Sequence, residues 1–125
     1  RSSGADATYV IGQTDFSRTS AGVGQSSLRT PYGITSDGTR IYIADAGNNR
    51  IIEFDSFPIA NGPSALSLYG QDSWSARTAN DDDQDGATDD TPSARTLSSP
   101  TGATYYNGVL YVTDRSNHRV LFFPD

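Results

Sequence analysis

Apolar and polar residues alternate along several short segments of the chain. In the segment RIYIAD, Ile41 and Ile43 fall on one face of an extended strand, and in VLYVTD, Leu110 and Val112 do the same. This alternation in β-branched and aromatic residues, bounded by turn sequences such as Ser-Asp-Gly, is typical of half-buried strands. No segment shows the 3.6-residue period of an amphipathic helix. The pattern predicts an all-β fold.

The predicted strands belong to a unit that occurs twice. Residues 28–54 align without a gap with 97–123, at an offset of 69. Upstream, residues 9–16 align with 67–74 at an offset of 58, and both copies share a Gly-Gln pair. The second copy therefore contains about eleven extra residues, which we place at 80–90. A repeated unit of this kind buries its faces only by stacking against its neighbours.

Each copy is expected to supply four antiparallel strands. The expected strands are 32–36, 40–44, 50–55 and 66–69 in the first copy, and 101–105, 109–113 and 119–123 in the second. The Gly-Gln strand that precedes the first copy, at 8–11, is a spare outer strand. The second copy correspondingly lacks a fourth strand.

Three polar positions recur after the second strand of each copy. They are Asp45, Asn48 and Arg50 in the first copy, and Asp114, Asn117 and Arg119 in the second. We expect the Asp carboxylate to accept hydrogen bonds from backbone N–H groups of the following turn, and the Arg to contact that Asp or a neighbouring unit. The only histidine, His118, corresponds to Asn49, and a catalytic imidazole is not normally replaced by an amide. The motif is therefore interpreted as structural.

The motifs Pro-x-Gly, Ile-Ala-Asp and Asn-Asn-Arg at 31–50, and their counterparts at 100–119, resemble NHL repeats. The resemblance implies one four-stranded β-propeller blade per repeat, and usually about six blades in a closed propeller. It divides the chain into an N-terminal arm with the spare strand (1–12), a first blade (13–70) and a second blade with the acidic insertion (71–125).

Two blades would leave two apolar faces and a strand edge uncovered. An open edge invites pairing with another chain, and a head-to-tail contact closes into a ring or grows into a filament. We therefore expect a homo-oligomer or polymer in which another subunit completes the second blade. The alternative is that the chain is a fragment of a longer six-bladed propeller that binds a protein or carbohydrate ligand.

Composition limits the classes of partner and the cellular locations that this chain is expected to have. The net charge of -6 argues against nucleic acid and anionic membrane surfaces as partners, and no apolar run is long enough for membrane insertion. All nine basic residues are Arg, and Cys and Met are absent. This bias favours an extracellular or cell-surface protein.

The insertion, NDDDQDGATDD, contains a candidate calcium site. The carboxylates that could converge on one cation are Asp81, Asp83, Asp85 and Asp89. Gly86 would permit the sharp turn that such a loop needs, but Pro92 stands where an EF-hand has its bidentate Glu. A partial Ca²⁺ loop and a solvated acidic loop are both compatible with this sequence.

No nucleophile–base pair, phosphate loop or dinucleotide fingerprint is present, so we expect a non-catalytic structural or interaction module. A propeller lyase or hydrolase would need His118 from several subunits around one axis. In a ligand-binding propeller, Tyr32, Trp74 and Tyr105 would line clefts between blades. The other reading of these aromatics is packing between blades.

Overall fold

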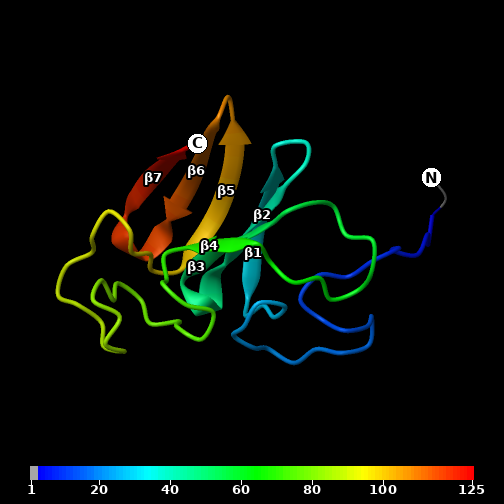
Figure 1. The fold of residues 1–125 in the computed structure, drawn as a ribbon, viewed down its shortest axis with the longest axis horizontal. Helices are drawn as coiled ribbons and strands as arrows, with labels where there is room; N and C mark the ends of the chain where they lie inside the picture. Colours follow the sequence, from blue (N-terminus) through cyan, green and yellow to red (C-terminus); the bar gives the residue numbers. More distant parts are fainter. Residues whose placement is uncertain (1–2) are drawn as a thin grey trace.

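The computed structural model describes residues 3–125, which contain two antiparallel sheets (Figure 1). The first sheet, blade 1, has four strands in sequential order: β1 (Pro31–Ser36), β2 (Ile41–Asp45), β3 (Arg50–Phe54) and β4 (Ser67–Tyr69). The second, blade 2, has three: β5 (Pro100–Tyr106), β6 (Val109–Asp114) and β7 (Arg119–Pro124). The all-β prediction and the positions of these seven strands are confirmed.

A tight turn connects the second and third strands of each blade. Between β2 and β3, a 3₁₀ turn (η1, Ala46–Asn48) is followed by Asn49 in the left-handed region, with φ 53°. Blade 2 repeats the turn as η2 (Arg115–Asn117), where His118 has φ 55°. Asn and His are among the residues that tolerate this conformation best outside Gly. The backbone of the turn thus explains why an amide and an imidazole can exchange at this position.

Blades 1 and 2 pack against each other through one apolar cluster. Tyr42, Ala44 and Ile51 of blade 1 contact the face of blade 2 that carries Leu110 and Val112, and all five are buried. The ring of Tyr105 stacks on that of Tyr42 with centroids 5.7 Å apart. In Figure 1 the two sheets lie side by side, with β5 facing β1 and β2.

A second apolar cluster covers the other face of blade 1. Ile41, Ile43, Ile52 and Phe54 point away from blade 2. They are covered by a set of residues from outside the sheet: Ile11, Leu28, Ala65 and Trp74. The arm and the loop between β3 and β4 therefore lie on the side of blade 1 opposite blade 2 (Figure 1).

One predicted strand is absent. Residues 8–11 form no strand within the described chain, because no neighbouring strand lies beside them to exchange ladder hydrogen bonds. Residues 1–2 of the predicted arm lie outside the described residues. Within 3–125, no helix has the length and apolarity that a membrane crossing requires.

Candidate functional site

The Asp–Asn–Arg motif of blade 1 forms a buried polar cluster. Asp45 accepts hydrogen bonds from the backbone N–H of Arg29 at 2.7 Å, from Asn48 Nδ2 at 2.8 Å and from Arg50 Nε at 2.7 Å. The side chains of Asp45 and Arg50 are both fully buried. The backbone donor precedes β1, so the predicted donor in the following turn is wrong. The carboxylate fixes the segment before β1 to the turn after β2.

Blade 2 repeats the cluster with the same distances. Asp114 accepts from the backbone N–H of Ser98 at 2.7 Å, from Asn117 at 2.8 Å and from Arg119 Nε at 2.7 Å. The two clusters differ in how far solvent reaches the arginine: the Arg119 side chain is 25% exposed, whereas Arg50 is fully buried.

The arginines also locate the insertion. Arg50 donates to the carbonyls of Gly24 and Ser27, and Arg119 donates to those of Ser93 and Thr96, which lie 69 positions later. The backbone bond from Gly22 to Leu28 recurs from Asn80 to Leu97, so Asn80 still follows the offset of 58. The insertion therefore begins after Asn80, and residues 81–92 replace the single residue Val23. These contacts place the eleven extra residues within 81–92, whereas the sequence alone placed them at 80–90.

Contacts that cross from blade 1 to blade 2 define a joint. The Thr35 hydroxyl accepts the Tyr105 N–H at 3.0 Å, and Asn49 Oδ1 accepts the Ser99 N–H at 2.8 Å. At Gly33 an added Cβ would lie 2.9 Å from the Thr101 carbonyl oxygen, so only glycine lets the backbones approach this closely. The sequence reasoning missed these polar joint residues, because nothing in a single copy shows that they reach the next blade.

The joint also buries a carboxylate. Glu53 is 5% exposed and accepts a hydrogen bond from the Ser67 hydroxyl at 2.5 Å, with Arg40 3.3 Å away. The Tyr69 hydroxyl lies 3.4 Å from the same carboxylate. Burial, followed by the negative charge of Glu53, raises the pKa of Tyr69 to about 12.

Two apolar surfaces remain open at opposite ends of the two-blade unit. On blade 1, an apolar groove lies beside the arm and is lined by Tyr9, Ile11, Leu28, Tyr32, Ile34 and Phe57 among others. On blade 2, the face directed away from blade 1 exposes Tyr106, Val120 and Phe122 at 70%, 53% and 64%. Within residues 3–125, no strand pairs with the outer edge of β7.

The three candidate ligand aromatics have different surroundings. Tyr105 lies in the joint against Tyr42. Trp74 packs against the outer cluster of blade 1, with the Arg50 guanidinium 5.9 Å from its ring centroid. Only Tyr32 is largely exposed, and it lines the groove. The structure does not bring the three together into one cleft.

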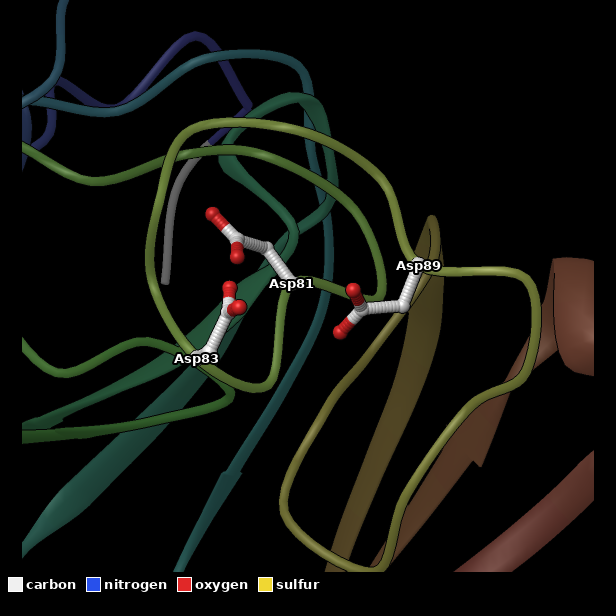
Figure 2. A group of neighbouring side chains, drawn as sticks. All are labelled: Asp81, Asp83 and Asp89. Carbon is white, nitrogen blue, oxygen red and sulfur yellow. The ribbon is translucent and has the colours of Figure 1, made fainter.

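The acidic loop gathers three of its four predicted ligands. Asp81, Asp83 and Asp89 each place a carboxylate oxygen within 4.8 Å of the others (Figure 2). Asp81 is buried, and its carboxylate accepts the backbone N–H groups of Asp85 and Gly86 at 3.1 and 2.9 Å. Asp85 instead caps the N–H of Ala87 and does not join the cluster. The hard oxygen donors and the preformed turn fit a small divalent cation.

Asp83 lies among other carboxylates of the loop, and its pKa is shifted. The largest single influence is the hydrogen bond from the backbone N–H of Asp85, which by itself favours a lower pKa for Asp83. Desolvation and the charges of Asp85 and Asp89 outweigh that bond, so that the pKa of Asp83 is raised. A bound cation would favour the ionised form of Asp83 and so offset these two causes.

A comparison with protein-family models identifies residues 97–123 as an NHL repeat. The matched segment covers β5, β6 and β7 together with the Asp–Asn–Arg cluster of blade 2. Residues 97–123 thus match one NHL repeat, and blade 1 repeats the strand order and the Asp–Asn–Arg cluster of the matched blade. No curated protein matches the chain.

Proposed function

We propose that this chain is a non-catalytic propeller module that assembles head-to-tail with copies of itself by strand exchange. One observation carries the proposal. The edge of β7 and the outer face of blade 2 are open, whereas the equivalent edge and face of blade 1 are covered by β4 and by blade 2. The exposed apolar side chains on the outer face of blade 2 favour association, and blade 1 of a second copy offers an apolar groove that could receive them.

The arrangement is a ring or a filament. Three copies of two blades would give a six-bladed ring, while a different rotation per copy would give an open helical polymer. Electron microscopy of the purified chain tests the proposal, because rings and filaments are distinguishable from monomers at sight. A field of particles no larger than one chain at micromolar concentration would contradict it. A longer chain could supply the neighbouring blades in cis, and joining three copies in tandem would then yield a closed six-bladed monomer.

The acidic loop is proposed as a Ca²⁺ site that stiffens the insertion of blade 2. Asp81, Asp83 and Asp89 would hold the ion, and the ion would neutralise carboxylates that otherwise repel one another. Ca²⁺ supplies no chemistry in this role beyond charge and coordination.

A setting at or outside the cell surface is proposed from composition alone. The chain lacks Cys, Met and Lys and is rich in Asp, Ser and Thr. The exposed Tyr32 and its groove would serve a protein or carbohydrate ligand if they are not filled by a second copy. Competition between added oligosaccharide and assembly would distinguish these occupants. An enzyme role would centre on His118, and loss of activity in a His118→Ala variant would be its signature.

A further inference from the structure

We infer the register and the contacts of the joint between copies, and this inference rests on the proposed function. Residues 9–11 of a second copy form the fourth strand of blade 2 by pairing antiparallel with β7. The register has three opposed pairs: Ile11 with Val120, Val10 with Leu121, and Tyr9 with Phe122.

The template for this register is the pairing of β3 with β4. In blade 1, Ile51 lies opposite Tyr69, Ile52 opposite Leu68 and Glu53 opposite Ser67. The offset of 69 converts the β3 residues into residues 120–122 of β7, and the offset of 58 converts the β4 residues into 9–11. Both offsets are fixed by hydrogen bonds that recur in the two blades. The register therefore follows from contacts made twice within the chain.

The arm already occupies the position of a fourth strand that belongs to a preceding blade. Ile11 packs in the cluster of Phe54, just as Tyr69 packs against Phe123 with ring centroids 5.1 Å apart. The next residue in each copy is a glycine with positive φ, and an added Cβ would lie 2.7 Å from Leu28 at Gly12 and 2.8 Å from Leu97 at Gly70.

The glutamine that follows confirms the equivalence. Gln13 Nε2 donates to the Ser20 carbonyl at 2.8 Å, and Gln71 Nε2 donates to the Thr78 carbonyl at 2.8 Å. The arm thus contacts blade 1 as β4 and its continuation contact blade 2. What the arm lacks is a strand beside it, and β7 of another copy has the complementary open edge.

The same transformation places blade 2 of one copy in the groove of the next. Tyr111, Thr113 and Val120 correspond to Tyr42, Ala44 and Ile51, which fill the joint within the chain. They would meet Ile34 and the outer cluster of blade 1, in place of Ala103 and the inner face of blade 2. The contact is apolar on both sides, and the groove next to the arm is of the matching character.

The polar contacts of the joint have counterparts as well. Thr35 has its equivalent in Thr104, whose hydroxyl would accept the N–H of Ser36 in the next copy. Asn49 has its equivalent in His118, which has the same left-handed backbone and is exposed in the single chain. The imidazole Nδ1 stands as many bonds from the backbone as Asn49 Oδ1, and it would accept the N–H of Thr30. His118 is thereby assigned a positioning role at the joint between copies.

Disulfide trapping tests the register, because the chain has no cysteine of its own. In an Ile11→Cys/Val120→Cys variant, the two thiols are opposed only between copies, within the Cα separation of about 4.4–6.8 Å that a disulfide needs. Mild oxidation is expected to give a ladder of covalent multimers on a non-reducing gel. The matched control, Tyr9→Cys/Val120→Cys, places the thiols two residues out of register and is expected to remain largely monomeric on the gel.

The outcomes separate the inference from the proposed function. If the wild-type chain assembles but the control crosslinks as readily as the 11/120 pair, or neither crosslinks, the register is wrong and the assembly stands. If the wild-type chain remains monomeric, both fail.

The role of His118 is tested by two substitutions at that position. His118→Asn is expected to retain assembly, because it restores the acceptor found at the joint within the chain. His118→Leu is expected to weaken assembly about tenfold by leaving a buried N–H without a partner. Equal association of the two variants overturns the assignment.

Discussion

Blade 1 and blade 2 carry the same repeat but have different neighbours. Ile51 of blade 1 is fully buried, while Val120 at the same position of blade 2 is 53% exposed. Glu53 and Phe122 also share one repeat position, and their exposure is the reverse of what polarity predicts. The acidic Glu53 is 5% exposed, whereas the aromatic Phe122 is 64% exposed. The difference shows that burial in this fold is set by the adjoining blade, and that a blade without a neighbour leaves apolar residues in water.

The largest expected effect comes from breaking the buried ion pair of blade 1. Asp45→Ala leaves the fully buried Arg50 without its carboxylate, which costs about 3–5 kcal/mol in free energy of unfolding. Asp114→Ala should cost clearly less in the dilute chain, because Arg119 is 25% exposed and water can solvate it. Urea denaturation of both variants at low concentration measures the difference. Equal losses would mean that coverage does not distinguish the two blades.

Removing an apolar side chain at one repeat position should sharpen the comparison. Ile51→Ala is expected to destabilise the chain by about 2–4 kcal/mol, because it opens a cavity in the joint. Val120→Ala should change the stability of the dilute chain by no more than about 0.5 kcal/mol and should instead weaken association. Thermal unfolding and light scattering separate the two effects. A stability loss at Val120 as large as that at Ile51 would contradict the open face of blade 2.

The acidic loop is present in blade 2 and has no counterpart in blade 1. If it binds Ca²⁺, an ion concentration of 100 times Kd stabilises the folded chain by about 2.7 kcal/mol, seen as a rise in Tm. Asp81→Asn should abolish the rise, whereas Asp85→Asn should preserve it, since Asp85 lies outside the cluster. Mg²⁺ is the ion control. A rise in Tm that survives Asp81→Asn would place the ion elsewhere.

The two left-handed turn positions offer a smaller contrast. Asn49→Ala and His118→Ala share a cost, because each replaces a residue type that tolerates the left-handed conformation with one that tolerates it less well. Asn49→Ala also removes the acceptor of the Ser99 N–H, which adds about 1 kcal/mol, whereas His118 is exposed in the dilute chain. Thermal unfolding of the two variants should therefore rank Asn49→Ala as the less stable. The reverse order would remove the joint role of Asn49.

The smallest expected effect is the alkaline sensitivity of the joint. Burial raises the pKa of Tyr69 to about 12, above its ordinary value of 10, so ionisation is favoured in the unfolded chain. The stability that this neutral hydroxyl contributes is present below pH 10 and is lost as the pH rises from 10 to 12. Tyr69→Phe should reduce the alkaline loss, and absorbance at the phenolate band follows the titration. The equivalent residue in the arm is Ile11, so the joint between copies should lack this sensitivity.

Local pattern was enough to place the seven strands and the repeat, because alternation and turn residues act within a few positions. Local pattern also predicted the contact between Arg50 and Asp45, because the two residues lie on either side of one tight turn. The N–H of Arg29, which lies sixteen positions upstream of Asp45, could not be found this way. Its place depends on how the segment before β1 folds back onto the turn.

Two other expectations depend on surroundings in the same way. Asp85 belongs to the Asp-x-Asp-x-Asp-Gly pattern, but its carboxylate caps the N–H of Ala87 instead of joining the cluster. Residues 8–11 have the composition of a strand but no neighbour, and a strand exists only in a ladder. In both cases the sequence indicates which conformations and contacts a segment can adopt, and the neighbouring parts of the structure determine which of them it adopts.

The most direct test of the account is the mass of the chain in solution before and after one change on blade 2. Sedimentation of the wild-type chain should give multiples of its 13.4 kDa mass that grow with concentration or stop at a closed ring. Val120→Asp should return the chain to a folded monomer, because it places a charge where the apolar joint would form. A wild-type chain that sediments at 13.4 kDa at every concentration would contradict the head-to-tail assembly.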